Sequence, residues 1–172
     1  MTTAIASDTT ATCFSPANIN GLSLKNRFIK AGTFENMTPK GVPGSALKHF
    51  HCKLADGGVA MTTLGYCAVE NDGRLNENMM YMHEGIRTQL SELIADLHRR
   101  GTKVSGQMGH CGGFSKNRQL SRRRPLGPSF GLNGLGLAQG MLFCDAMSLS
   151  DINAMVSNYS RAAVFMKSLG FD

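Results

Sequence analysis

Apolar side chains recur at helical spacing in three segments of the chain. The most regular segment runs from Gly85 to Arg100, where the apolar positions are Ile86, Leu90, Leu93, Ile94 and Leu97. Basic residues at its carboxyl end complement the helix dipole, and Gly101 is a typical helix-ending residue. This pattern predicts an amphipathic helix that packs one face against a core.

Two further helices are predicted on either side of this segment. The first spans Ser45 to Ala55, with Ser45 as its N-cap and a glycine pair after its end. The second spans Ser150 to Leu169 and begins with the capping-box-like sequence SLSD at 148–151. Its spacing predicts a buried face made of Ile152, Met155, Val156, Tyr159 and Ala163.

Short β-prone runs precede the three helices. They cover residues 28–31, 59–63 and 103–108, while the glycine-rich segment 109–140 has no strong period. Alternating strands and helices indicate βαβ units with a parallel sheet. No GxGxxG follows the first run, so the dinucleotide-binding fingerprint is absent. A barrel of eight such units takes about 250 residues, and we therefore expect this chain to end just before a fourth strand.

The composition favours one globular domain. The chain has 172 residues, of which 42% are hydrophobic and 17% charged, so it can bury a sizeable core. The net charge of +6 raises the question of an anionic partner. However, the basic run Arg122–Arg124 has no interleaved aromatic residues and is typical of a solvated loop, so we expect no nucleic-acid partner. No apolar run approaches the roughly eighteen residues that span a bilayer, so we expect no membrane association.

The cysteines and histidines indicate neither a metal site nor a disulfide framework. The five cysteines are widely spaced without a CxxC pair, which favours reduced thiols in a cytoplasmic protein. Four histidines in or beside predicted helices are expected at the surface: His49, His51, His83 and His98. His110, in a loop, is interpreted as structural. The start, MTTAIASDTTATC, lacks the regions of a secretory signal, and we expect residues 1–13 to form a flexible tail.

Four stretches, in order, resemble motifs of the Old Yellow Enzyme-like family of FMN-dependent NAD(P)H oxidoreductases. They are LKNRFIKAGTF, DGGVAMTTLGYCAVENDGR, GTKVSGQMGHCGGFS and RAAVFMKSLGFD. The first three resemble the first three strands of that family with their following turns, and the fourth resembles the helix before its fourth strand. The resemblance implies an α/β fold: residues 14–172 as the N-terminal part of a flavin-binding (β/α)8 TIM barrel, truncated before the fourth strand.

Details of these motifs refine the resemblance. The GYC sequence at 65–67 resembles the Glu-Tyr-Cys of the branch with trimethylamine dehydrogenase and dienoyl-CoA reductase. Gly32 stands where a proline is common, and Gly113 replaces the usual arginine of the third-strand motif. Phe34 replaces the cysteine that attaches the flavin covalently in trimethylamine dehydrogenase. Any FMN in this protein is therefore expected to be non-covalent.

The resemblance also implies roles for residues at the ends of the first three strands. Gln107 would bond the pyrimidine edge of FMN, because an amide offers both a donor and an acceptor. Ala31, Gly32 and Thr33 would flank the ring, where small residues allow backbone to come close, and Tyr66 would lie near it. Taken alone, Gln107 is more often a polar residue at a strand end than a flavin ligand, and only the family context reverses that interpretation.

The implied activity is hydride transfer through the flavin. NAD(P)H would reduce FMN, and the flavin would reduce a small-molecule substrate with an activated double bond. The family's substrate-binding His/His or His/Asn pair and its phosphate loops would lie beyond Asp172, so no catalytic residue is assigned within the chain. The alternative is a non-catalytic truncated paralogue or splice form that only associates with a partner. A homo-oligomer also remains open.

Overall fold

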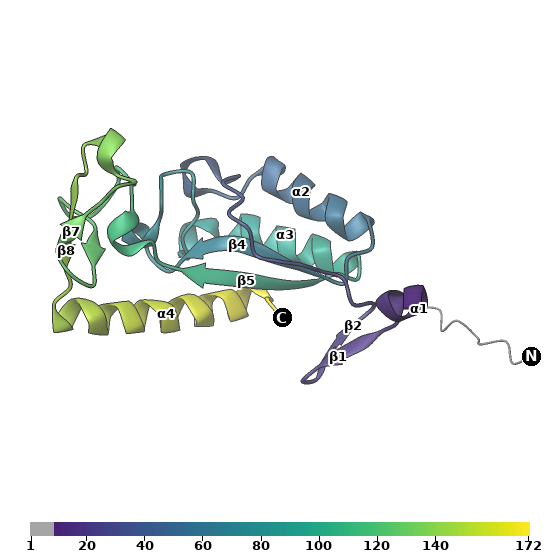
Figure 1. Ribbon diagram of the computed structural model, residues 1–172. Coiled ribbons are helices and arrows are strands. Elements are labelled where there is room, and N and C mark those ends of the chain that lie inside the picture. Colours follow the sequence, from purple (N-terminus) through teal and green to yellow (C-terminus); the bar gives the residue numbers. More distant parts are fainter. Residues whose placement is uncertain (1–8) are drawn as a thin grey trace, which may run out of the picture.

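A three-stranded parallel sheet forms the centre of the structure, a computed structural model that describes residues 9–172. Its strands are β3 (Ile29–Lys30), β4 (Met61–Ala68) and β5 (Lys103–Gly109), in the order β3-β4-β5. Met61 pairs with Ile29 on one side and with Lys103 on the other. Figure 1 shows the sheet as an open layer, with α2 and α3 over β4 and α4 along β5.

All three long helices pack on the same face of this sheet. They are α2 (Ser45–Asp56), α3 (Arg87–Arg99) and α4 (Leu149–Leu169). Because side chains alternate along a strand, Leu64 of β4 and Val104 of β5 both point to the helices, and both are fully buried. Residues from all of these elements form one core: Leu47, Leu64, Leu90, Leu93, Ile94, Leu97, Val104, Ala162, Met166 and Leu169.

A small hairpin precedes the sheet. It follows the short helix α1 (Thr9–Phe14) and consists of β1 (Ala17–Ile19) and β2 (Leu22–Leu24), which are antiparallel. Asn20 and Gly21, with φ of 46° and 91°, form its turn. The predicted tail, residues 1–13, lies mostly outside the described residues, and its flexibility stays a prediction.

The glycine-rich segment after β5 forms a second, smaller sheet that the sequence did not indicate. Its strands β6 (Leu126–Gly127), β7 (Gly131–Leu132) and β8 (Phe143–Ala146) lie in the order β6-β8-β7. Strands this short carry too few residues for a period of two to be recognised. The remaining elements are short 3-10 helices at Pro39–Gly41, Asn71–Gly73, Glu84–Ile86, Gly112–Phe114 and Leu137–Gln139.

The predicted elements exist, but some of their details were wrong. The N-cap of α2 is Gly44 rather than Ser45, and no side chain caps this end. The second predicted strand continues to Ala68, because its carboxyl half stays paired with β5. The capping box of α4 is confirmed: the Ser148 hydroxyl accepts from the Asp151 N–H, and the Asp151 carboxylate accepts from the Ser148 N–H.

The predicted buried face of α4 was wrong in part: Met155 and Tyr159 are half-buried and pack against the core, but the other three residues do not. Ile152, Val156 and Ala163 are exposed, and the buried positions are instead Asn158, Ala162, Met166 and Leu169. The carboxyl half of the helix lies along β5, whereas its amino half extends toward the small sheet (Figure 1). Ile152 and Val156 of the amino half therefore remain exposed.

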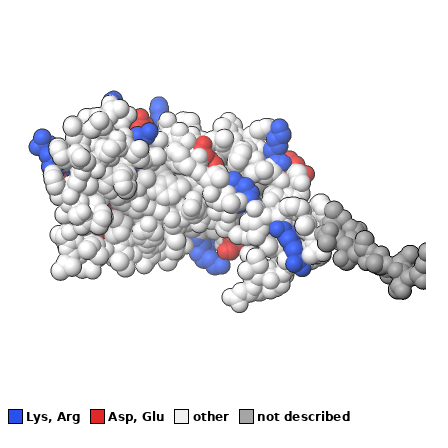
Figure 2. Space-filling model, in the orientation of Figure 1, with Lys and Arg blue, Asp and Glu red and all other residues white. Residues whose placement is uncertain are grey.

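The basic residues do not gather into a single patch on the face that Figure 2 shows. As expected for a solvated loop, Arg122 and Arg123 are exposed. Arg122 lies 3.4 Å from a carboxylate oxygen of Asp151, and Arg124 lies 3.1 Å from one of Asp145. Within residues 9–172, no helix combines the length and the hydropathy that crossing a bilayer requires.

Asp172 connects the end of the chain to β5. Its N–H donates to the Val104 carbonyl at 2.9 Å, and its carboxylate accepts from the Val104 N–H at 2.8 Å. The same carboxylate accepts from Lys103 Nζ at 2.7 Å and lies 2.8 Å from His98 Nε2. Burial acts to raise the pKa of Asp172, but the hydrogen bonds from Lys103, Val104 and His98 outweigh it and lower the pKa.

This lowered pKa predicts a pH-dependent contribution to stability. A carboxyl group whose pKa falls on folding stabilises the protein above its unfolded pKa of about 3.9, and the effect is lost as the pH falls through the folded pKa. Asp172→Asn should therefore lower the free energy of unfolding at pH 7, and this difference should shrink below about pH 4. Urea unfolding at several pH values measures it.

Asp56→Asn is the matched control, because Asp56 makes a surface ion pair with Arg100 and is 63% exposed. Such a pair contributes little, so the control should unfold like the parent at every pH. A destabilisation by Asp172→Asn that is the same at pH 7 and pH 3 would contradict the assignment to the ionised carboxylate.

Candidate functional site at the carboxyl ends of the strands

The carboxyl ends of the three parallel strands lie side by side. The turn Ala31–Thr33 directly follows β3, Gly65 and Tyr66 lie near the end of β4, and Gln107 lies near the end of β5. In the β4–β5 ladder, Gly65 stands opposite Gln107. The structure therefore brings Ala31, Gly32, Thr33 and Gln107 to one edge of the sheet. The backbone of Tyr66, the fifth predicted site residue, lies at the same edge.

The turn after β3 packs so closely on its neighbours that two positions have no room for a side chain. A Cβ atom on Gly32 would lie 2.8 Å from Gln107 Oε1. A Cβ on Gly65 would lie 2.7 Å from the Thr33 carbonyl oxygen and 3.2 Å from the same amide oxygen. At Gly65 the obstacle is the Thr33 backbone, so only glycine fits there, whereas a Cβ on Gly32 would displace the end of the Gln107 side chain. The backbone of the turn thus forms a close-packed surface beside the Gln107 amide.

Gln107 presents an amide to solvent beside this surface. Its residue is exposed, and across residues 9–172 its side chain has no hydrogen-bond partner. Ala31 and Thr33 of the turn are exposed as well. An amide with both a free donor and a free acceptor can bind a ligand edge that alternates acceptor and donor groups.

Tyr66 begins at the same strand end but points its ring toward β5. Its hydroxyl donates to the Gly73 carbonyl at 3.1 Å and lies 3.4 Å from Cys111 Sγ. Burial, followed by the hydrogen bond with Cys111, raises the pKa of Tyr66 above its ordinary value. The phenol is therefore neutral at physiological pH, and its orientation is fixed by the loop that carries Gly73.

A buried arginine organises that loop, and the sequence did not single it out. Arg74 is 2% exposed, and its guanidinium donates to the Glu77 carbonyl at 3.3 Å and to Gln119 Oε1 at 2.9 Å. It also lies 5.2 Å from the centre of the Tyr81 ring, a cation–π contact. Because Gly73 precedes Arg74, these contacts hold in place the carbonyl that accepts from Tyr66.

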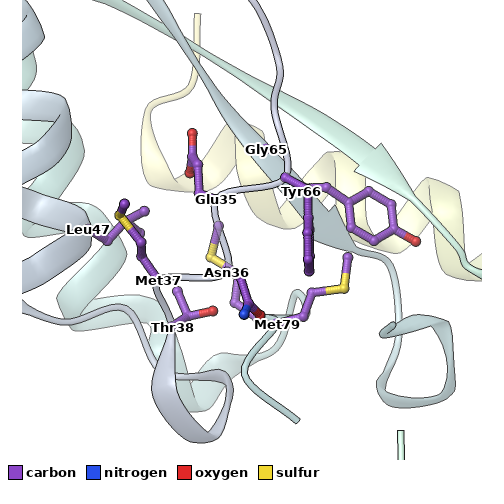
Figure 3. Close-up of a pocket in the computed structure, with 10 residues that line it drawn as sticks. Glu35, Asn36, Met37, Thr38, Leu47, Gly65, Tyr66 and Met79 are labelled. Atoms are coloured by element: carbon purple, nitrogen blue, oxygen red, sulfur yellow. The ribbon is translucent and has the colours of Figure 1, made fainter. Parts of the chain in front are cut away.

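Behind the turn lies a small cavity, shown in Figure 3 with Gly65 and Tyr66 on one side and Met37 and Leu47 on the other. Glu35, which lines this cavity, belongs to a buried charged cluster with Lys30 and His51 that sequence reasoning also missed. The expected surface position of His51 was wrong, since its side chain is 0% exposed. Its ring packs between α2 and β4, where Nδ1 lies 2.8 Å from Thr62 Oγ1.

His110 has the structural role that was expected of it. The Gly112 N–H donates to His110 Nδ1 at 2.9 Å, so the ring proton of the neutral tautomer is on Nε2. Nε2 lies 3.2 Å from Glu70 Oε1, and the hydrogen bond with His110 is the largest cause of the lowered pKa of Glu70. Both ring nitrogens are thus used within the protein.

The described part of the chain contains no cluster of metal-binding side chains and no disulfide. From residue 9 onward, no three metal-binding side chains gather. All five cysteines are unpaired, and burial, together with the charge of Glu35, raises the pKa of the Cys67 thiol to about 12. A thiol of such high pKa is a poor nucleophile at neutral pH.

Comparisons with known proteins identify relatives of this fold. The profile of the NADH:flavin oxidoreductase / NADH oxidase family matches residues 12–172. The 4,4′-dithiodibutanoate disulfide reductase of Rhodococcus erythropolis is 35% identical over 165 residues, which are 95% of this chain and 39% of that protein. A metal reductase of Desulforamulus reducens is 24% identical and matches 92% of this chain and 23% of that protein.

Solved structures share the fold. Morphinone reductase, in complex with tetrahydroNAD, superimposes with a TM-score of 0.82 at 21% identity, over 93% of this chain and 47% of that one. The Old Yellow Enzyme from a Pichia species gives a TM-score of 0.82 at 18% identity, over 94% and 44%. The chain thus spans less than half the length of these relatives, and the predicted α/β portion of a barrel is confirmed, with its sheet open rather than closed.

The contact between the Tyr66 ring and β5 predicts that a methyl group added at Gly109 destabilises the protein. A Cβ on Gly109 would lie 1.8 Å from the Tyr66 ring, so Gly109→Ala must displace the ring from its hydrogen bonds. Overpacking of this kind costs about 1–3 kcal/mol. We expect a loss of that size in urea unfolding, together with a weaker tyrosine signal in near-UV circular dichroism.

Gly134→Ala is the control, since a Cβ on Gly134 would have no atom within 4 Å. Its free energy of unfolding should stay at the parent value or rise slightly, because alanine restricts the unfolded chain. Equal effects of the two substitutions would contradict the packing of Tyr66 on Gly109.

Proposed function

The chain belongs to the NADH:flavin oxidoreductase / NADH oxidase family, and we propose that it carries the ring-binding part of an FMN site in an NAD(P)H-dependent oxidoreductase. One observation carries this proposal: the backbone of the Ala31–Thr33 turn, Gly65 and the free amide of Gln107 meet at one edge of the sheet. Ligands of parallel barrels bind at this edge, where the carboxyl ends of the strands meet.

The residues present fit a flat, edge-polar cofactor. A Cβ on Gly65 would overlap the Thr33 backbone, and one on Gly32 would press on the Gln107 amide, so the two glycines let the turn and that amide lie close together. Gln107 is the group that would hold the pyrimidine edge of FMN, with Ala31 to Thr33 against the ring. Phe34, 47% exposed after this turn, offers no nucleophile for a covalent bond, so the cofactor is held by contacts alone.

Bound FMN supplies the capacity to accept a hydride from NAD(P)H and to pass it to an acceptor. The residues of this chain bind the flavin ring and orient it. Gln107 fixes the ring edge by its amide, and the turn excludes water from one part of the ring. Tyr66 stays a neutral phenol whose hydroxyl donates to the Gly73 carbonyl, so we propose that its ring is a fixed part of the site and that it does not act as a proton donor.

The acceptor is proposed to be a small molecule with an activated double bond. A second candidate acceptor is an organic disulfide, favoured by the 35% identity to a protein named 4,4′-dithiodibutanoate disulfide reductase. The two are separated by assaying oxidation of NAD(P)H with an enone or with a disulfide. In the alternative non-catalytic reading, the purified protein is colourless and oxidises NAD(P)H with neither.

Substitution of Gln107 tests the proposed ring contact. FMN is titrated into the purified chain, and binding is followed by quenching of flavin fluorescence. Gln107→Leu should weaken binding by about 1–3 kcal/mol, because polar groups on the ring edge lose their partner. Gln89→Leu, at an exposed position of α3, is the control and should bind FMN like the parent. Parental affinity of Gln107→Leu would remove Gln107 from the site.

Riboflavin provides a second test on the same chain. The proposed contacts reach the ring of the cofactor, and the proposal assigns no residue of this chain to its phosphate. FMN and riboflavin should therefore bind this chain with Kd values within about tenfold of each other. A preference for FMN far above this would mean that residues of this chain bind the phosphate, which the proposal does not assign.

A further inference from the structure

A buried ion pair and a buried histidine connect the two ends of the turn after β3. Lys30, the last residue of β3, forms an ion pair with Glu35, and the two residues flank the turn 31–34 on either side. His51 of α2 lies beneath them, with Nε2 at 3.2 Å from Glu35 Oε2, although the two atoms do not have hydrogen-bond geometry. The turn is thus a short loop whose two ends are joined by side chains as well as by the backbone.

The cluster is almost completely shielded from water. The exposed fractions of the Lys30, Glu35 and His51 side chains are 12%, 4% and 0%. Removing such charges from water costs about as much as their attraction returns, so a buried ion pair is weak evidence for stability. What a buried pair does provide is a defined geometry, because moving either partner leaves the other charge without compensation.

Each member of the cluster is also attached to β4. Lys30 Nζ donates to the Thr63 carbonyl at 2.8 Å, His51 Nδ1 lies 2.8 Å from Thr62 Oγ1, and the Glu35 N–H donates to the Gly65 carbonyl at 3.0 Å. These contacts fix the far end of the turn against the strand that carries Gly65. The near end is already fixed by the pairing of Lys30 with Thr62 in the ladder.

The position of the turn matters because it packs closely on Gly65 and on the Gln107 amide. The Thr33 backbone lies so close to Gly65 that a Cβ there would overlap it, and Gly32 stands equally close to the Gln107 amide. A shift of the turn by a fraction of an ångström would press the Thr33 backbone on Gly65 or displace the Gln107 amide from Gly32. No other side chain of the turn is buried enough to prevent such a shift, because Ala31, Thr33 and Phe34 are all exposed.

We propose that Glu35 is a positioning residue, which through Lys30 and His51 holds the Ala31–Phe34 turn in the shape that receives the flat ring of the cofactor. This inference rests on the proposed function for the identity of the ligand. It does not rest on it for the role of Glu35 in the turn, which exists without ligand. Glu35 acts through the turn and touches no reacting atom.

Hydrogen exchange on the chain without flavin tests the positioning role. In Glu35→Gln, amides of residues 31–36 should exchange about tenfold or more faster, relative to the amides of α3, than in the parent. The exchange of α3 reports global unfolding and corrects for any loss of stability. Glu92→Gln, at an exposed position of α3, is the matched control and should leave both segments unchanged.

A double variant keeps the test decisive if Glu35→Gln unfolds. Lys30→Met with Glu35→Gln removes both charges, so global stability should return to near the parent value while the turn still exchanges fast. Parallel acceleration of the turn and of α3 in both variants would reduce Glu35 to a purely stabilising residue and overturn the proposal. So would a turn that exchanges as slowly in the double variant as in the parent.

Titration with FMN separates this inference from the proposed function. If the parent chain binds FMN, Glu35→Gln should bind it about tenfold or more weakly and with a shifted flavin absorption band. An unchanged affinity and spectrum, despite a loosened turn, would overturn the role of Glu35 toward the ligand. If the parent chain itself fails to bind FMN, the proposed function fails, whereas the exchange experiment still decides whether Glu35 holds the turn.

Discussion

The pairing of β4 with both of its neighbours is the constraint on which the rest of the structure depends. Met61 pairs with Ile29 and with Lys103, and the β4–β5 register that starts there places Gly65 opposite Gln107. Beyond Gly65 the register shifts by one residue, so that Tyr66 has no partner and Cys67 pairs with Met108. The same register directs Leu64 and Val104 toward the helices and leaves Gln107 exposed. Core and site are thus two faces of one ladder, and a slip by one residue would exchange them.

The sequence predicted those elements whose stability is visible in local periodicity. The helix α3 buries Leu90, Leu93, Ile94 and Leu97 along one stripe, as its spacing indicated. In the amino half of α4, periodicity alone gave a face that is only partly right, because Met155 and Tyr159 pack against the core while Ile152 and Val156 are exposed. The small sheet of β6, β7 and β8 depends on contacts between distant residues, such as Cys144 beside Gly113 and Gly127, and no local pattern announces these.

Some residues of the candidate site could likewise be predicted from the sequence, and others could not. Gly32 and Gln107 were identified because they fall in motifs that resemble those of a known family, and the structure brings them together. Glu35 and His51 were missed because the chain separates them by a whole turn and part of a helix, and because histidine at a helical position resembles a surface residue. A lysine and a glutamate flanking a glycine-containing turn, as Lys30 and Glu35 do, are a signal that could have suggested the cluster.

The docking of Asp172 on Val104 has a kinetic consequence. The ladders between β3, β4 and β5 join segments that are separated by one helix each, whereas Asp172 meets β5 only after the long segment with the small sheet. Closing a longer loop costs more chain entropy, so this contact forms after the local units during folding. Interactions absent from the folding transition state act mainly on the rate of unfolding. We therefore expect the carboxylate of Asp172 to affect how long the folded state lasts more than how fast it is reached.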